Sequence, residues 1–473
     1  MRSVAVFAQE VSISMLYSGQ TMRSAVPGFG TFSRRRLLGW SLGLSGMFAA
    51  CRQAGSQSQA QVGPPVEVTF MRPADQFLAR AYEAQAERFN QKQSRLRARF
   101  DPSAGNDYGG WLAKLTSMLA TDTAPDCFLV QQFDLPALAS GRVLLDLTPL
   151  LARDAREVNP SDFFPSHLEG GRWRDRQVAL TPDGCAILEY YNLTLFQEAG
   201  LQPPQPTWTW HEYLEMARRL TKRDATGQIV QAGIGTLPTG NQLLPWLWSN
   251  GADLFSPDFR EVRIGDRAAV EALQFAVDLV QTHGVTTGSP GVALGQDPIR
   301  EGKVAMWRAN RGFFGSIQQV TAFKFNVVPL PRAPRTGMST TVTTPGHIAI
   351  AASNKRPDAA WEWLKFLTST EALIIRSEIA GGCPSRKSAT EHPSYRDYTI
   401  PALASTDANK TFAEVLQDPR TARFVPKYIA INDAINIASR HITAATRGEV
   451  SVMAAIDAAR QELEALLRQK PQP

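Results

Sequence analysis

Cysteine is scarce in this chain: its 473 residues include four, at Cys51, Cys127, Cys185 and Cys383. They lie far apart and show none of the C-x-x-C spacings that are typical of zinc sites. A chain of this length also builds a large apolar core, so it does not depend on a disulfide scaffold. The spacing leaves open that one pair of cysteines meets in space.

Motifs of catalysis and nucleotide binding are missing as well. Residues 302–303 lack the glycine spacing and the Ser/Thr of a P-loop, residues 233–235 lack the third glycine of a dinucleotide site, and no G-x-S-x-G elbow occurs. The six histidines are scattered, with no metal-binding pair among His167, His211, His283, His347, His392 and His441. We therefore expect no metal, no cofactor and no catalytic residue. An exported carbohydrate-active enzyme remains an alternative, because an acid and a base can come together from distant segments.

Long hydrophobic runs are also absent, since a membrane-spanning helix needs about 20 apolar residues. The stretch "SRRRLLGWSLGLSGMFAAC", from Ser33 to Cys51, has three arginines before a shorter apolar run. Such a pattern is typical of a secretory signal peptide. Residues 33–38 resemble a twin-arginine export signal. Residues 48–51, "FAAC", resemble a bacterial lipobox, although Phe48 stands where leucine is usual.

We therefore predict a signal peptide over residues 1–50 and a lipid on Cys51. Met22 is an alternative start because it lies closer to the arginines than Met1. The mature protein would be in the periplasm or at the cell surface, held to the membrane by the lipid alone. Residues 51–65 are rich in Gln, Ser and Gly and predict a flexible tether.

The net charge of +6 does not indicate a nucleic-acid-binding protein. Five arginines fall within the first 50 residues, so the basic balance belongs partly to the leader. No run of Lys and Arg that would grip a phosphate backbone follows it. We expect no nucleic-acid partner.

Strands and helices alternate through the remaining chain, which is long enough for two domains. Such alternation predicts βαβ units around largely parallel sheets, an α/β fold. The apolar patterns predict strands at 66–70, 97–100, 126–130, 187–191, 304–307, 325–328 and 347–352. They predict helices at 75–90, 111–119, 270–280, 358–367 and 452–467, and one capped by Thr207 that runs to about residue 221.

Several aromatic residues have polar residues and glycines as sequence neighbours in two stretches, "LPWLWSNGADLF" (244–255) and "VAMWRANRGFFG" (304–315). A sugar ring offers an apolar face for stacking and hydroxyls for planar polar side chains. These stretches therefore predict sugar-contacting residues. The alternative is that Trp246 and Trp248 simply fill the core.

The stretch from Pro182 to Lys222 resembles the middle of the family 1 extracellular solute-binding proteins, the receptors of bacterial ABC importers that include the maltose-binding type. The family pattern is Tyr-Tyr-Asn, then Phe-x-x-Ala-Gly-Leu, then Pro-x-Thr-Trp; here it is supplied by residues 190–192, 196–201 and 206–208 in the order expected. Other stretches agree in the same order, including "TAPDCFLVQ", "GRVLLDLTPLL", "SNGADLF", "REGKVAMW", "FNVVPLP" and "SNKRPDAAWEWLKFL".

The resemblance implies two Rossmann-like lobes with a hinge and a ligand cleft between them, the type II periplasmic binding protein fold. By analogy the first lobe is 66–165 and 345–384, and the second is 166–344 and 385–473. It implies a monomer that binds a small sugar or related polyol and delivers it to ABC importer permease subunits. Open α/β sheets bind ligands at strand carboxyl ends, so we expect ligand-binding residues at Arg72, Gln131, Gln132, Phe133, Trp307, Arg311, Phe313 and Phe314. The aromatic stretch 244–255 adds Trp246 and Asn250, and the resemblance adds Asp183.

One departure affects the polar part of that site. The maltose-type proteins offer an acidic residue where this chain has Cys185, and Asp183 lies two positions earlier. Arg72, Arg308 and Arg311 leave open a glycerol-phosphate-type ligand, because guanidinium groups bind phosphate in bidentate fashion. A two-lobed sensor that signals to a membrane kinase is a further alternative.

Overall fold

The computed structural model describes residues 64–74, 76–102, 108–235, 240–343 and 345–470. They belong to one compact unit that runs from Val62 to Pro473. The predicted signal peptide, Cys51 and nearly all of the tether lie outside the described residues. No helix within the described ranges is long and apolar enough to cross a membrane.

The first five-stranded sheet has the order β2-β1-β3-β13-β6. Its strands are β1 (Val66–Met71), β2 (Leu96–Asp101), β3 (Cys127–Gln131), β6 (Leu180–Asp183) and β13 (Gly346–Ala349). β1 pairs in parallel with β2 and β3, whereas β13 runs antiparallel to both of its neighbours, β3 and β6. The strands β1, β2, β3 and β6 therefore all end at the same edge of the sheet.

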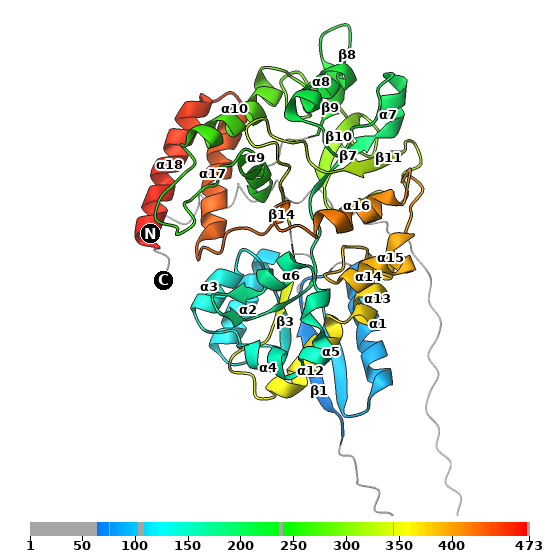
Figure 1. The fold of residues 1–473 in the computed structure, drawn as a ribbon, viewed down its shortest axis with the longest axis vertical. Helices are drawn as coiled ribbons and strands as arrows, with labels where there is room; N and C mark the ends of the chain where they lie inside the picture. Colours follow the sequence, from blue (N-terminus) through cyan, green and yellow to red (C-terminus); the bar gives the residue numbers. More distant parts are fainter. Residues whose placement is uncertain (1–63, 75, 103–107, 236–239, 344, 471–473) are drawn as a thin grey trace, which may run out of the picture. The chain divides into compact units, whose positions relative to one another are not determined.

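Successive side chains of a strand point to opposite faces of the sheet. Apolar side chains on both faces of this sheet are buried because helices cover each face. In β3, Cys127 packs with α1 (Gln76–Lys92) and α12 (Pro357–Leu367), while Phe128 packs with α2 (Tyr108–Ala120). Figure 1 shows α1, α2 and α12 around β1 and β3.

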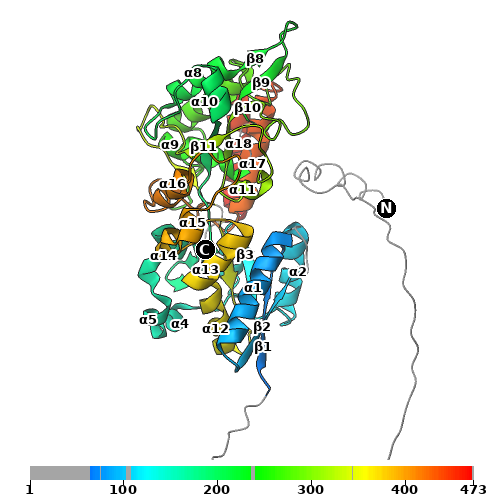
Figure 2. The same ribbon diagram turned by 90° about the vertical axis from the view of Figure 1, so that its right-hand side faces the viewer.

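The second five-stranded sheet has the order β11-β7-β10-β9-β8. Its strands are β7 (Leu188–Asn192), β8 (Lys222–Arg223), β9 (Ile229–Ile234), β10 (Val304–Ala309) and β11 (Phe325–Val328). One face packs on α8 (Trp210–Leu220), α9 (Leu244–Ser249), α10 (Arg267–Gln281), α17 (Ile431–Thr446) and α18 (Val452–Gln469). Figure 2 shows α8 and α10 beside β9 and β10. The other face carries an aromatic core with α16 (Asp407–Val415).

The chain passes between the two sheets along neighbouring segments. One leads from β6 to β7, and a second leads from β12 (Thr341–Val342) to β13. A third follows α13 (Thr370–Ala380). Isolated bridges join the first segment to the other two, at Ala186↔Thr343 and Asp183↔Pro384. We refer to the described residues of these three crossing segments, 183–187, 342–343 with 345–346, and 381–385, as the hinge segments.

Two sequence predictions differ from the structure. The sequence places 166–183 in the second lobe, but its last four residues form β6 and pair with β13 in the first sheet. Helix α8 is capped by Thr209 rather than Thr207: the Thr209 side chain accepts from the Glu212 backbone and Glu212 bonds back to Thr209. This reciprocal capping box satisfies two backbone donors and therefore fixes the start of the helix at Trp210.

Candidate functional site

Three of the predicted residues meet at the edge of the first sheet where its parallel strands end. Arg72 follows β1, Gln131 is the last residue of β3 and Asp183 is the last residue of β6. Gly346, the first residue of β13, is paired with both Gln131 and Asp183. We call this edge, with Arg72, Gln131 and Asp183, the polar edge.

An arginine that the sequence did not indicate completes the polar edge. Arg376, on α13, forms an ion pair with Asp183 at 2.6 Å between Nη2 and Oδ2. Its side chain is 7% exposed and that of Asp183 is 18% exposed. Arg72 lies nearby, where its Nη1 donates to the hydroxyl of Tyr82 at 3.0 Å. The same Tyr82 hydroxyl interacts with Arg376, so it lies between two guanidinium groups.

A tyrosine and a carboxylate lie beside Gln131 at the same edge. The Tyr108 hydroxyl donates to Asp134 Oδ2 at 2.8 Å and accepts from the Gln131 backbone N–H at 2.9 Å. Burial and the charge of Asp134 raise the pKa of Tyr108, and burial raises the pKa of Asp134 against the effect of this hydrogen bond. The pair therefore places a phenol and a carboxyl group beside the strand end. Asp134 is not among the site residues predicted from the sequence. Its position directly after the predicted 131–133 stretch, at the end of a buried strand, could have indicated it.

Gln132 and Phe133 connect the first sheet to the second rather than extending the polar edge. Gln132 is buried; its Nε2 donates to the Thr343 carbonyl at 2.8 Å and its Oε1 accepts from the Val425 N–H at 3.4 Å. Phe133 is half-buried and packs against the large core of the second sheet. Both contacts link the end of β3 to hinge segments and the second sheet.

The predicted aromatic cluster lies mostly inside the second sheet's aromatic core. Trp307 and Phe314 are 3% and 2% exposed, and Trp307 stacks on Tyr190 with centroids 5.5 Å apart. Phe313, at the start of α11 (Phe313–Ser316), is half-buried and meets the Tyr190 ring edge-on. Of these three rings, Phe313 keeps the accessible surface that ligand stacking requires.

Arg311 is held inside the protein. Its guanidinium lies 4.3 Å from the Tyr395 ring centroid; Nε donates to Asn409 Oδ1 at 2.9 Å and Nη1 to the Gly382 carbonyl at 2.7 Å. The side chain thereby ties the second sheet to the hinge segment 381–385.

Trp246 and Asn250 are also internal. Trp246 is 1% exposed and carries the Arg308 guanidinium 4.0 Å from its ring centroid. Asn250 is buried at the C-cap of α9, where its Nδ2 donates to the Ala268 carbonyl at 2.8 Å. Five of the predicted ligand-binding residues are buried and therefore offer no surface to a ligand in this structure: Trp246, Asn250, Trp307, Arg311 and Phe314.

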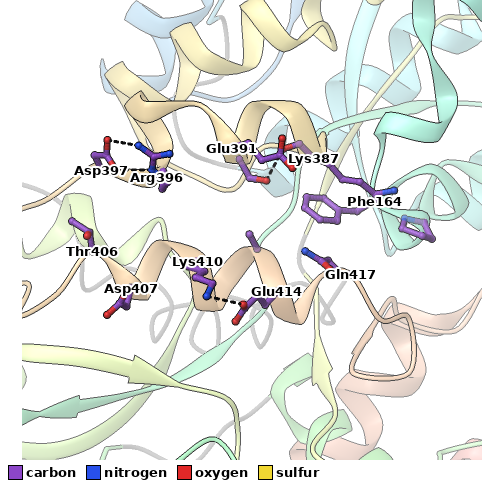
Figure 3. A pocket seen from close by; sticks show the side chains of 13 residues that line it. Phe164, Lys387, Glu391, Arg396, Asp397, Thr406, Asp407, Lys410, Glu414 and Gln417 are labelled. Atoms are coloured by element: carbon purple, nitrogen blue, oxygen red, sulfur yellow. Dashed lines mark hydrogen bonds and ion pairs between the residues drawn. The ribbon is translucent and has the colours of Figure 1, made fainter.

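The structure also contains a cavity of about 790 Å³ that none of the predicted residues lines. It lies among α6 (Pro165–Gly170), α14 (Lys387–Glu391), α15 (Pro393–Arg396) and α16. Figure 3 shows Lys410 paired with Glu414 and Arg396 paired with Asp397 along its walls. No group of three metal-ligating side chains occurs in the described part of the chain.

Comparisons with known proteins agree on the fold. Solved structures resemble the chain over 84–86% of its length and nearly their whole length. One is the ABC substrate-binding protein Lmo0181 of Listeria monocytogenes in complex with cycloalternan, with a TM-score of 0.72, 20% identity and 85% and 99% of the two chains covered. Another is the sugar-binding protein MalE of Xanthomonas citri, with a TM-score of 0.73, 17% identity and 85% and 98% covered. The α/β fold with two Rossmann-like lobes is thus confirmed as the type II periplasmic binding protein fold.

Sequence comparison adds a curated relative and a family. The probable amino-acid ABC transporter periplasmic-binding protein y4oP of Sinorhizobium fredii is 24% identical over 239 residues, 47% of this chain and 51% of that protein. The chain thus spans about half the length of the curated relative it matches. The family model described as "Bacterial extracellular solute-binding protein" matches residues 76–374, more than half of the chain. The chain belongs to this family of bacterial extracellular solute-binding proteins.

Proposed function

We propose that this chain is the solute receptor of an ABC importer and that it binds a small carbohydrate at the polar edge. The observation that carries the proposal is the convergence of Arg72, Gln131 and Asp183 at the ends of three strands, next to the hinge segments. Hydroxyl-rich ligands suit such an edge because carboxylates accept from hydroxyls and guanidinium and amide groups donate to them. A receptor of this kind closes its lobes on the ligand, with Phe313 as the stacking ring from the second sheet.

The names of the relatives point to two classes of ligand, sugars and amino acids. The structural neighbours include the cyclic alpha-maltosyl-1,6-maltose binding protein of Arthrobacter globiformis, which favours a sugar. The curated relative is named for amino-acid transport. Arg72 and Arg376 at the polar edge also suit an acidic or phosphorylated solute. We place the sugar first because Phe313 and the polar edge together provide both a stacking face and hydroxyl partners.

Thermal-shift screening distinguishes these classes. The panel would contain neutral mono- and oligosaccharides, sugar acids, polyol phosphates and amino acids. A ligand at 100 times its dissociation constant stabilises the folded state by about 2.7 kcal/mol. A shift with neutral sugars supports the proposal, whereas a shift confined to amino acids or phosphates assigns the other solute class. Product analysis with each bound sugar tests the enzyme alternative, since a receptor returns its ligand unchanged.

We further propose that the mature protein begins at a lipidated Cys51 and works as a monomer in the periplasm or at the cell surface, held to the membrane by the lipid. The "FAAC" sequence and the following tether support this proposal. Mass spectrometry of the membrane-bound protein would find a lipid on an N-terminal Cys51. Cys51→Ser should give a released protein that still binds the ligand found in the screen, and an unmodified N-terminus within the tether would show simple secretion instead.

Lobe closure forms the last part of the proposal. We propose that the first lobe takes in 66–183, since β6 belongs to the first sheet, together with 345–384, and that the second lobe is built on the other sheet. Small-angle scattering with and without ligand is the test. Closure predicts a smaller radius of gyration at saturation, and an unchanged radius argues for a rigid cleft.

A further inference from the structure

Arg311 reaches from the second sheet into a hinge segment. It lies between β10 and α11 and is 1% exposed. Its Nη1 donates to the Gly382 carbonyl at 2.7 Å, and its Nε donates to Asn409 Oδ1 at 2.9 Å. Asn409 lies on α16, whose apolar side chains pack in the aromatic core of the second sheet. The two bonds therefore hold the hinge segment 381–385 against the second sheet.

The two acceptors give this contact a direction. The Nδ2 of Asn409 donates to the carbonyls of Arg396 at 3.1 Å and Tyr398 at 2.8 Å, so its Oδ1 is fixed toward the guanidinium. The Nη2 of Arg311 has no hydrogen-bond partner among the described residues. A buried cation with an unpaired nitrogen is only partly compensated for its lost hydration. The arrangement thus provides a fixed two-point contact at a cost in stability.

Gly382 lies between Arg311 and the arginine of the polar edge. Its φ is +95°, and a Cβ at this position would lie 2.8 Å from the Nη1 of Arg376, closer than a nonbonded contact allows. Arg376 is the residue whose guanidinium pairs with Asp183 at 2.6 Å. Glycine is therefore needed here for two reasons, because it adopts the positive φ without strain and leaves room for the guanidinium that holds Asp183.

The hinge backbone also fixes the end of β6. The Gly184 N–H donates to the Cys383 carbonyl at 3.1 Å. The Ser385 N–H donates to the Pro182 carbonyl at 3.2 Å. These two bonds pair the hinge backbone with the residues on either side of Asp183. The segment that the arginine holds therefore also positions the carboxylate of the polar edge.

At its other end the contact fixes the turn that carries Phe313. The Phe313 N–H donates to the Asn310 carbonyl at 3.1 Å, and the next N–H, that of Phe314, donates to the Arg311 carbonyl at 3.0 Å. The Tyr190 hydroxyl also donates to the Asn310 carbonyl, at 2.8 Å. Phe313 thus follows the arginine within one tight turn. A guanidinium fixed at the hinge therefore restricts the directions in which this ring points.

We propose that Arg311 is a positioning residue for solute binding, which holds the Phe313 turn and the Asp183 carboxylate in a defined relation through Gly382. This role rests on the proposed function, in which Phe313 and Asp183 contact the solute. Arg311 acts without touching the solute because it is buried. Binding groups that are fixed beforehand lose less conformational entropy when the solute arrives. Loss of the contact therefore weakens solute binding.

Arg311→Met removes both bonds, and Arg386→Met is the matched control. Arg386 is also buried and lies 4.0 Å from the centroid of the Phe163 ring. Its partners include the Val158 carbonyl at 2.8 Å and the Asp162 carboxylate at 3.2 Å, which both belong to 66–183. Each variant leaves buried acceptors unpaired, so both should unfold more easily than the wild type.

Affinity separates the two variants. It is measured by calorimetry with the neutral sugar that gives the largest shift in the thermal-shift panel. Binding should be about 10-fold weaker in Arg311→Met and unchanged in Arg386→Met. Unchanged affinity in a folded Arg311→Met protein would overturn the positioning role, and so would an equal loss in both variants.

Arg311→Lys tests whether the charge alone is sufficient, and it serves as the main variant if Arg311→Met does not fold. A single ammonium group lacks the planar fork that directs separate donors at Gly382 and Asn409. We therefore expect the same loss of affinity as in Arg311→Met. Wild-type affinity in Arg311→Lys would overturn the two-point contact.

Gly382→Ala and Gly381→Ala form a second matched pair. The φ angles of the two glycines are +95° and +70°, so both alanine variants carry backbone strain. A Cβ at Gly381 meets nothing within 4 Å, whereas a Cβ at Gly382 displaces the Arg376 guanidinium. Sugar binding should therefore be weaker in Gly382→Ala than in Gly381→Ala, by about 10-fold. Equal affinities would show that Gly382 does not help to position Asp183.

Hydrogen exchange without solute tests the contact separately from the proposed function. Arg311→Met should speed exchange in 312–317 and in 381–385 together, whereas Arg386→Met should leave 312–317 unchanged. Faster exchange in only one of the two segments, or in neither, would overturn the link between them. If the wild type binds no sugar of the panel, the proposed function fails, and the exchange result alone decides whether Arg311 holds the two segments together.

Discussion

Asp183 and Arg376 form an ion pair of 2.6 Å at the point where β6 ends and the first hinge segment begins. The carboxylate predicted to meet the ligand is thus already fixed by a guanidinium from α13. Because the ion pair holds the Asp183 carboxylate in place, the side chain loses little conformational entropy when it accepts a hydrogen bond from a ligand hydroxyl. The pair also compensates two charges that are mostly removed from water.

Replacing Asp183 tests both roles. Asp183→Asn keeps the side-chain size but leaves the Arg376 charge buried without its partner, so we expect a loss of about 3 kcal/mol in the free energy of unfolding. If Asp183 also accepts from a ligand hydroxyl, the affinity should fall about 10- to 100-fold. Urea denaturation and calorimetry on the same preparation measure the two effects.

The exposed pair Arg396–Asp397 provides the control for that experiment. Asp397→Asn should change neither unfolding nor ligand affinity measurably, because solvent screens the pair. An Asp183→Asn protein that is destabilised yet binds with unchanged affinity would confine Asp183 to a structural role.

The neighbouring rings Phe313 and Phe314 should respond differently to truncation. Phe314 is 2% exposed, so Phe314→Ala should cost about 3–5 kcal/mol of stability. Phe313 is half-buried, so Phe313→Ala should cost less stability and weaken sugar binding. Melting temperature without ligand and calorimetry with ligand separate the two effects. Retained affinity in a clearly destabilised Phe313→Ala protein would remove Phe313 from the site.

Much of the fold was predictable because local pattern and tertiary structure agree. The alternating or continuous apolar runs at 66–70 and 325–328 became β1 and β11 with nearly the predicted bounds. β6 was not predicted because "LTPD" is four residues long and contains a proline, so no periodicity marks it. Its pairing with β13 joins residues distant in the sequence, and this pairing places β6 in the first sheet.

The sequence predicts site residues that lie at strand ends, but it does not predict which of the other candidate residues are buried. Arg72 and Gln131 follow from the rule that parallel strands end at one edge, whereas Asp183 follows from the family resemblance alone. Asn310, Arg311 and two glycines around the aromatic cluster predict an exposed site. Arg311 is buried instead, because it bonds to Asn409 and Gly382, which lie 98 and 71 residues away in the sequence. A single sequence does not reveal partners at such separations.

Acid should destabilise the protein through two buried histidines. Burial lowers the pKa of His167 to about 4 and that of His347 to about 3. The unfolded chain therefore binds protons below about pH 6.5, while the folded chain does not until the pH approaches 4 or 3. Stability is fully present above about pH 6.5 and is lost as the pH falls, by about 1.4 kcal/mol per pH unit for each histidine.

Variants isolate the histidine contribution from that of titrating carboxylates. His167→Gln and His347→Gln should each reduce the slope of unfolding free energy against pH between 6 and 5, measured by urea denaturation. An exposed control is His211→Gln, which should leave the slope unchanged. Parallel curves for wild type and both buried-site variants would rule out the histidines as the cause.

The buried pair of Glu189 and Arg308 should be more costly to break than to replace. Nε of Arg308 lies 2.9 Å from Glu189 Oε2, with side chains 7% and 0% exposed, and the guanidinium also rests on the Trp246 ring. Arg308→Met leaves Glu189 buried without its cation, for an expected loss of about 3–5 kcal/mol. The double variant Arg308→Met with Glu189→Gln should recover most of that loss, which a double-mutant cycle by urea denaturation measures.

The pH dependence of the single variant gives an independent readout. Burial raises the pKa of Glu189, and Arg308 opposes this rise, so Arg308→Met should raise the pKa further. An acid whose folded pKa is raised contributes stability below its unfolded pKa and loses it as the pH rises. The destabilisation by Arg308→Met should therefore be larger at pH 8 than at pH 5 and should lose this dependence when Glu189→Gln is added. Equal destabilisation at both pH values would mean that Glu189 finds another cation or water once Arg308 is gone.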